Sequence, residues 1–229
     1  MKVLVSDFDG VFFTEDYEKN IKLVNKFVDQ GNIFVLATGR NIADLRKDMN
    51  DHFIKCSYFL CNDGATIFDQ FMNIIYRKDI EPKIVRIMYN ALSSVSCVAD
   101  VFLDNSTAYM FDVNRPTNKI VGRIANQDKC LELADKINQF YPEVYAYVSR
   151  HWINITNRSE TKLTAINFLE KYYNFDNYDI YAIGNGVNDM CFAKMDNGYV
   201  LSSAYITVKK EFKNTIDSFE DMVNMLLNN

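Results

Sequence analysis

Two aspartates, Asp7 and Asp9, follow an apolar run at the start of the chain, one residue apart and just before a glycine. Three later stretches hold polar groups of a compatible kind, at 38–40 (Thr-Gly-Arg), at Lys162 and at 184–189 (Gly-Asn-Gly-Val-Asn-Asp). Phosphoryl transfer needs such a set, because the transferring group is anionic and catalysis is mostly positioning and charge stabilisation. The residue types therefore predict phosphoryl-transfer chemistry.

The two aspartates suit different steps of that chemistry. A carboxylate such as Asp7 can attack phosphorus and form an acyl phosphate, provided that a cation cancels the repulsion between two anions. Mg²⁺ is the expected cofactor, because it prefers oxygen ligands and bridges readily to phosphate. Asp9 points to the same side of an extended chain and can protonate the leaving oxygen and later deprotonate water. Gly10 lets the backbone turn away from the phosphate.

These groups must be positioned by regular elements, and the first 60 residues alternate strand and helix. The expected strands are 3–6, 32–37 and 57–61, and the expected helices are 17–30 and 41–49. Such alternation predicts a parallel sheet with helices on its faces, in which ligands bind at the carboxyl ends of the strands. Asp7, Asp9 and Thr38 all fall at such ends.

The middle of the chain has a different pattern, in which strands follow one another without helices between them. The expected elements there are helices 82–94 and 127–140 and strands 97–103, 107–114, 119–125 and 144–149. This pattern predicts an antiparallel sheet with helices on one side, inserted into the first domain. Alternation then returns, with helices at 161–172, up to about 193 and from about 217, and strands at 178–184 and 198–202. We expect a catalytic core from 1–79 and 155–229 and an inserted domain from 80–154.

Five motifs in order resemble one known family. They are "DFDGVF" (7–12), "LATGR" (36–40), "NDGA" (62–65), "TKLTAI" (161–166) and "IGNGVNDM" (183–190). Together they resemble the haloacid dehalogenase superfamily, and within it the Cof-type, subfamily IIB sugar-phosphate phosphatases. The resemblance implies a Rossmann-like α/β core with a parallel sheet and an inserted α+β cap domain of the C2 type, which closes over the site and selects the leaving group.

The resemblance also implies catalytic roles. Asp7 would be the nucleophile and Asp9 the general acid and base. Thr38 would bind the phosphate, with Gly39 giving access to the backbone. Lys162 would steady the nucleophile and the phosphate charge.

The implied magnesium site uses Asp7, the backbone carbonyl of Asp9, and Asn185 and Asp189, directly or through water. Asn188 would contact the phosphate or support the metal ligands. Arg40 could contact the substrate or pair with a carboxylate, and the sequence leaves both open.

Three residues depart from the family pattern. Val11 stands where a threonine is usual, Leu163 where a glycine often follows the motif lysine, and Asn185 where the fourth motif usually has its first aspartate. An asparagine can still ligate Mg²⁺ through its carbonyl oxygen, but the site loses one negative charge. We therefore expect weaker metal binding.

Composition narrows the class of protein. A net charge of −5 argues against a nucleic-acid binder, which usually carries a basic excess. No stretch approaches the ~18 apolar residues of a membrane span, and no signal peptide is recognisable, so we expect a cytoplasmic protein without membrane partners. The five cysteines are odd in number and lack CxxC spacing, which favours buried, reduced thiols.

The function expected is a Mg²⁺-dependent phosphatase acting on a small phosphorylated metabolite, with a sugar phosphate favoured. Three alternatives stay open: a phosphomutase, a signalling receiver domain and a non-catalytic metabolite sensor on the same fold. The sequence also leaves open which cap residues (Tyr109, Phe111 or Arg115) face the substrate, and the oligomeric state. His52 and His151 fall in no motif and are not expected to be catalytic.

Overall fold

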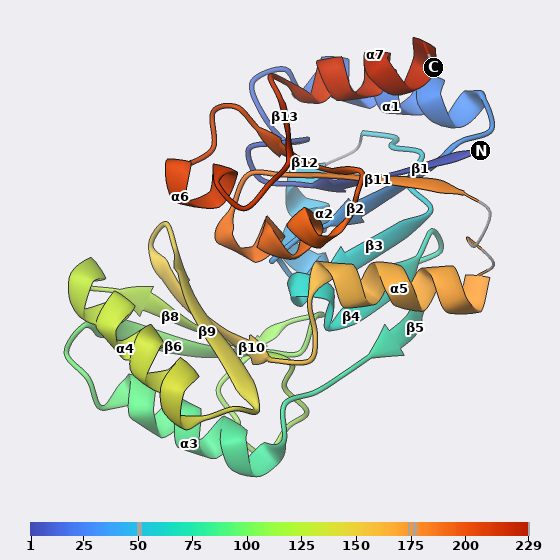
Figure 1. Ribbon diagram of the computed structural model, residues 1–229. Coiled ribbons are helices and arrows are strands. Elements are labelled where there is room, and N and C mark those ends of the chain that lie inside the picture. The colour runs from blue at the N-terminus through green and yellow to red at the C-terminus, as the bar shows by residue number, and fades with distance from the viewer. Residues whose placement is uncertain (50–51, 174, 176–177, 229) are drawn as a thin grey trace.

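The chain folds around two separate β-sheets (Figure 1). The computed structural model describes residues 1–49, 52–173, 175 and 178–228. One sheet is built from both ends of the chain, and the other from the middle of the chain. The predicted combination of an α/β core with a second, antiparallel layer is confirmed.

The core sheet has eight strands in the order β13-β12-β11-β1-β2-β3-β4-β5. Its strands are β1 (Lys2–Asp7), β2 (Ile33–Ala37), β3 (Tyr58–Cys61), β4 (Thr66–Asp69), β5 (Ile74–Arg77), β11 (Asp179–Gly184), β12 (Gly198–Leu201) and β13 (Asn214–Ile216). The strands from β13 to β3 run parallel, and β4 and β5 add antiparallel strands at one edge. The sequence did not predict β4, β5 or β13, because strands of three or four residues carry little periodicity.

Helices cover both faces of the core sheet. Helices α1 (Tyr17–Asp29), α2 (Ile42–Met49) and α7 (Phe219–Asn228) pack on one face. Helix α5 (Lys162–Tyr173), helix α6 (Ile206–Lys209) and the 3₁₀ segment η2 (Val187–Lys194) pack on the other. In α1 the residues Ile21, Val24 and Phe27 recur at helical spacing and are all buried, which is why this segment forms a helix against the sheet.

The cap sheet has five antiparallel strands in the order β7-β6-β8-β10-β9. They are β6 (Val98–Asp104), β7 (Tyr109–Met110), β8 (Lys119–Ile124), β9 (Val144–Ser149) and β10 (Trp152–Asn157). Helices α3 (Pro82–Ser93) and α4 (Gln127–Phe140) cover one face through a shared apolar cluster. Alternate strand residues such as Ile153 and Ile155 join that cluster, so the intervening residues point to the opposite face, toward the core.

Three segments differ from the expected elements. The strand expected at 107–114 shrinks to β7, because the side chains of Asn105 and Asp112 accept hydrogen bonds from nearby backbone N–H groups and form turns instead. The helix expected up to about residue 193 is a 3₁₀ segment, η2. Strand β10 was not among the expected elements. It pairs along its whole length with β9, so the expected domain boundary at 154/155 falls inside it.

The order of the core strands decides where the polar motifs meet. Strand β1 lies between β11 and β2, with Ser6 opposite Ile183 and Asp7 opposite Ala37. The three strands run parallel, so their carboxyl ends lie at one edge of the sheet. Figure 1 shows the cap sheet on that side of the core. None of the described helices combines the length and the apolar composition that a membrane span requires.

Candidate active site

A buried lysine joins two aspartates at the centre of this edge. Lys162 opens helix α5, and its Nζ donates hydrogen bonds of 2.6 Å to Asp7 Oδ1 and of 2.6 Å to Asp189 Oδ1. Lys162 and Asp189 are fully buried, and Asp7 is 5% exposed. Three motifs distant in the sequence therefore supply one compact charged cluster, which we call the Lys162 cluster (Asp7, Lys162 and Asp189).

The Lys162 cluster has two acids for one base. Burial, and next the charge of Asp189, raise the pKa of Asp7 from 3.8 to about 7, although Lys162 acts in the opposite direction. Burial alone would lower the pKa of Lys162, but the charges of Asp189 and Asp7 outweigh it and raise that pKa. The lysine is therefore a fixed cation, and the cluster has an electrostatic need for one more positive charge.

The position of Asp189 explains how the fourth motif is held together. Its Oδ2 accepts hydrogen bonds from the backbone N–H groups of Asn185 (3.0 Å) and Gly186 (2.9 Å). Both carboxylate oxygens of Asp189 are thus occupied, and the residue lies behind the wall of the pocket rather than on it. Its Oδ1 accepts a single hydrogen bond and keeps a second lone pair, so the expected role of Asp189 in the metal shell, directly or through water, stays a prediction.

Asp9 is held by an arginine from the second motif. Arg40 donates from Nε (2.8 Å) and from Nη2 (2.6 Å) to the two oxygens of Asp9, and it also pairs with Asp48. Of the two possibilities that the sequence left open, the structure thus shows carboxylate pairing for Arg40. This fork fixes the orientation of Asp9 at the mouth of the site.

The loop after β1 brings Asp9 and Asn185 together. Gly10 has a φ of 77°, in the left-handed region that favours glycine, and a Cβ at this position would lie 2.7 Å from Nδ2 of Asn185. That same Nδ2 donates to the backbone carbonyl of Asp9 over 3.2 Å. Val11, one of the departures from the family pattern, is buried in the apolar core beneath this loop.

The second motif contributes a backbone turn rather than an exposed hydroxyl. Thr38 is fully buried, and its Oγ1 accepts a 3.1 Å hydrogen bond from the N–H of Arg40. Gly39 lines the pocket and leaves its backbone accessible there. The contact between Thr38 and phosphate expected from the sequence remains a prediction.

A second buried lysine, Lys119, was not found from the sequence. It comes from cap strand β8, and its Nζ donates to Asp63 Oδ2 (2.7 Å), to the carbonyl of Gly39 (2.7 Å) and to the hydroxyl of Tyr147 (3.3 Å). The hydroxyl of Tyr147, on β9, donates in turn to Asp63 over 2.8 Å. Asn188, predicted to contact phosphate, donates to Asp63 Oδ1 over 2.8 Å.

We call Asp63, Lys119 and Tyr147 the Lys119 cluster. Burial alone would raise the pKa of Asp63, but the charges of Lys119 and Lys162 outweigh it and hold that pKa below its usual value. Asp63 has a φ of 60°. It belongs to the "NDGA" motif, so the sequence did carry a signal for this residue. Lys119 carries no local signal, because a lysine at the start of an expected strand is usually exposed.

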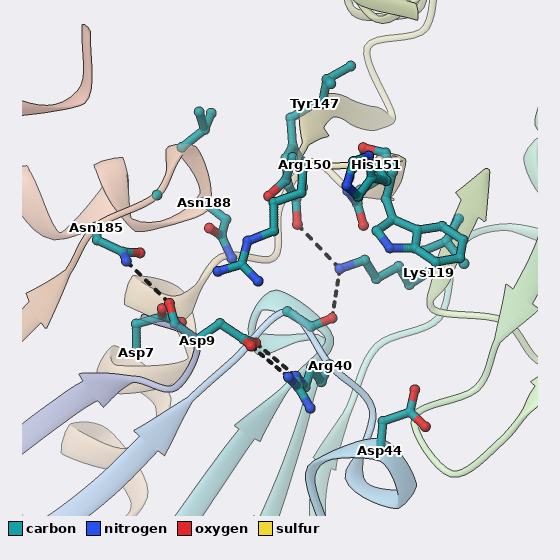
Figure 2. A pocket seen from close by; sticks show the side chains of 18 of the residues that line it. Asp7, Asp9, Arg40, Asp44, Lys119, Tyr147, Arg150, His151, Asn185 and Asn188 are labelled. Carbon is teal, nitrogen blue, oxygen red and sulfur yellow. Dashed lines mark hydrogen bonds and ion pairs between the residues drawn. The ribbon is translucent and has the colours of Figure 1, made fainter. Parts of the chain in front are cut away.

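The two parts of the molecule enclose a pocket of about 900 Å³ between them. Its floor includes Asp7, Asp9 and Asn185 from the core, and its roof includes Trp152 and Arg150 from the cap. Figure 2 shows the cap side chains above the carboxylates of Asp7 and Asp9, with Arg40 below. Of the three cap residues considered from the sequence as substrate contacts, Tyr109 lines the pocket. His151, which falls in no motif, lines it as well.

The donor atoms on the pocket floor fit a small divalent cation such as Mg²⁺. Asp7 gives one oxygen to Lys162, and its other oxygen has no hydrogen-bond partner among the described residues. The carbonyl of Asp9 and the amide of Asn185 meet beside it, and rotation of that amide would present its oxygen. No group of three or more His, Cys, Asp or Glu side chains suited to a metal occurs in the described ranges, so such a site depends on carbonyl and amide oxygens, which Mg²⁺ accepts.

The cysteines are confirmed as free thiols. Cys56, Cys61, Cys97 and Cys130 are buried, and Cys191 is half-buried. None lines the pocket.

Comparison with known proteins places the chain in a family. The model of the haloacid dehalogenase-like hydrolases matches residues 4–114 and 98–223. A relative from Buchnera aphidicola, named as a candidate phosphatase, is 21% identical over 245 residues, which cover 93% of this chain and 90% of the relative.

Solved structures share the whole fold at low identity. A candidate HAD/COF-like hydrolase from Plasmodium vivax superposes with a TM-score of 0.86 at 16% identity, over 100% of this chain and 96% of that one. A subclass IIB sugar phosphatase superposes with a TM-score of 0.79 at 15% identity, over 100% and 98% of the two chains. The resemblance inferred from the motifs is confirmed: the chain belongs to the haloacid dehalogenase-like hydrolases and is an enzyme of that family.

Proposed function

We propose that this hydrolase is a Mg²⁺-dependent phosphatase that cleaves a small phosphorylated metabolite through an aspartyl-phosphate intermediate. The observation that carries the proposal is Asp7, a buried carboxylate anchored by Lys162 on the floor of a pocket that the cap covers. A sugar phosphate is the substrate class that we favour, in line with the subclass IIB sugar phosphatase of the same fold.

The residues support a two-step reaction. In the first step the free carboxylate oxygen of Asp7 attacks phosphorus, the bond from phosphorus to the leaving oxygen breaks, and Asp9 gives that oxygen a proton. In the second step water attacks the same phosphorus, Asp9 takes the proton from the water, and the Asp7 carboxylate is released with inorganic phosphate. Mg²⁺, when bound by Asp7, the Asp9 carbonyl and Asn185, would supply the positive charge that lets two anions approach.

The surrounding residues keep these groups in place. Lys162 fixes one oxygen of Asp7 and carries permanent positive charge beside the phosphate. Arg40 donates to both oxygens of Asp9 and fixes their orientation, and Asp9 would loosen this pairing when it carries the proton. Asp189 holds the backbone of Asn185 and Gly186 rather than contacting substrate.

The cap supplies a compartment for the leaving group. We propose a domain division in which the segment from the start of α3 to the end of β10 forms the cap, and the remainder of the chain forms the core. Trp152, Tyr109 and Leu131 line the cap side of the pocket and are each more than one third exposed. A cavity of about 900 Å³ exceeds what a phosphate ion alone requires, which supports a leaving group of metabolite size.

The test is release of inorganic phosphate from a panel of phosphorylated metabolites with Mg²⁺, run beside Asp7→Asn. We expect turnover of at least one member, loss of turnover in the variant and a phosphorylated enzyme on rapid quenching. Transfer of the phosphoryl group only to a second sugar hydroxyl would indicate a phosphomutase. Binding without turnover across the panel would favour a metabolite sensor and contradict the proposal.

A further inference from the structure

Nearly all charges in and beneath the pocket are paired. Lys162 joins Asp7 and Asp189, Arg40 joins Asp9 and Asp48, Lys119 joins Asp63, and Lys47 joins Asp44. In the described part of the chain, Arg150 is the one lysine or arginine lining this pocket that has no acidic partner. A guanidinium above several carboxylates, paired with none of them, is available to an anion that enters from outside.

Arg150 reaches from the cap to the catalytic loop of the core. It belongs to the two-residue connection between β9 and β10. Its Nη2 lies 3.8 Å from the position that a Cβ on Gly10 would occupy, next to the amide of Asn185. Figure 2 shows the side chain extending downward from the cap, with its guanidinium between Asn188 and Asp9. The group therefore faces the reacting atoms rather than the outer, leaving-group part of the pocket.

The backbone at this residue is in an uncommon conformation. Arg150 has a φ of 51°, in the left-handed region that glycine adopts freely and that other residues adopt at a cost. A glycine would make the same connection without strain. An arginine held in a strained turn, with its side chain directed into the site, is consistent with a functional role for that side chain.

We infer that Arg150 binds the transferred phosphate from the cap side, opposite Lys162 and Gly39. The inference rests on the proposed phosphatase function and adds to it a substrate contact that no motif indicates. An arginine suits this role because its planar fork matches two phosphate oxygens and stays charged at any working pH. The phosphate would then lie between a core cation and a cap cation, so that binding favours the closed arrangement of cap and core.

The test compares Arg150→Gln, Arg150→Gly and the control Arg123→Gln. Arg123 lies on the same cap sheet, is exposed, pairs with Asp100 and does not line the pocket, so its replacement removes the same charge elsewhere. Two quantities are measured with Mg²⁺: the KM for the best substrate of the panel, and the dissociation constant of inorganic phosphate by calorimetry. Thermal unfolding reports folding.

We expect both Arg150 variants to raise KM and the phosphate dissociation constant by a similar factor, about 10- to 100-fold, as for loss of a hydrogen bond to a charged group. The melting temperature of Arg150→Gly should be no lower than that of the parent, and Arg123→Gln should match the parent throughout. A higher KM with unchanged phosphate affinity would mean that Arg150 contacts the leaving group, and would overturn the inference. Unchanged values for both would overturn it as well.

The two proposals can fail separately. If the parent protein turns over nothing, the phosphatase function fails, yet calorimetry with inorganic phosphate still tests Arg150. If turnover is found and the dissociation constant of inorganic phosphate is unchanged in the Arg150 variants, the function stands and this inference fails.

Discussion

Two lysines are buried among the residues that the structure describes, one from the core and one from the cap, and they are paired in different ways. Lys162 is fully buried and shared between two carboxylates, Asp7 and Asp189. Lys119 is 2% exposed and pairs with one carboxylate, Asp63. Its other two hydrogen bonds go to the carbonyl of Gly39 and the hydroxyl of Tyr147.

The two clusters differ in net charge, and this difference suggests different roles for them. Burial, and next the charge of Asp189, raise the pKa of Asp7 in the Lys162 cluster, and the excess negative charge of this cluster creates a demand for a cation. The Lys119 cluster is balanced, and its charges hold the pKa of Asp63 low. An unbalanced buried cluster is poised for a ligand, whereas a balanced one that crosses from cap to core mainly holds the two parts together.

The largest expected effect concerns Asp7, the acid of the Lys162 cluster that lines the pocket. Asp7→Asn removes the attacking oxygen and should lower kcat by about 10³-fold or more. Steady-state phosphate release with the best panel substrate measures it, with near-UV circular dichroism as the control for folding. Turnover within tenfold of the parent would exclude Asp7 as the nucleophile.

Breaking the balanced cluster should affect stability most. Lys119→Met leaves Asp63 buried without its cation and should cost about 3–5 kcal/mol of unfolding free energy. The double variant Lys119→Met/Asp63→Asn should recover most of that loss, because no uncompensated charge remains. Denaturant unfolding measures both.

The matched control for that prediction is Lys47→Met, which breaks an exposed pair with Asp44 and should cost less than about 1 kcal/mol. A loss for Lys119→Met no larger than that of the control would show that the cap–core pair contributes little to folding.

The unbalanced cluster should make metal-free stability depend on pH. The pKa of Asp7 is raised to about 7 in the folded state, so the folded state holds this proton more tightly than the unfolded chain. Its contribution favours folding at low pH and is lost as pH rises from about 4 to about 7.

Asp7→Asn removes this dependence, so with a chelator present the variant should become more stable than the parent as pH rises, by at most about 4 kcal/mol. Thermal unfolding between pH 4 and pH 8 gives the difference. Parallel curves for the two proteins would contradict the raised pKa, and added Mg²⁺ should reduce the gap.

The smallest expected effect concerns the departure at the fourth motif. Asn185→Asp adds a negative charge beside the Asp9 carbonyl and should tighten Mg²⁺ binding by about tenfold, while lowering the stability of the metal-free protein. Isothermal titration with Mg²⁺ measures the affinity. An unchanged affinity would show that residue 185 does not contribute to the metal site.

Much of the core and its chemistry could be predicted from residue patterns. Apolar strands that end in Asp7 or in Thr38 indicated a parallel sheet with polar groups at one edge, because parallel strands place their carboxyl ends together. Strands that follow one another without helices between them, such as those at 97–103 and 107–114, indicated the antiparallel cap sheet. The short strands β4, β5 and β13 were missed, because elements of that length leave too little pattern. Strand β10 was missed as well, and the expected domain boundary fell inside it.

The contacts between cap and core were decided only by the tertiary structure. Asp63 and Lys119 lie 56 residues apart, Asp63 and Tyr147 lie 84 residues apart, and Arg150 comes from a turn that no motif marks. These contacts depend on how one sheet is set against the other, and that geometry follows from packing over many residues rather than from any local spacing. The order of residue types along the chain thus determined the two sheets and the carboxylates at the edge of the core sheet. The docking of the two sheets determined which charges are balanced and which remain available to a ligand.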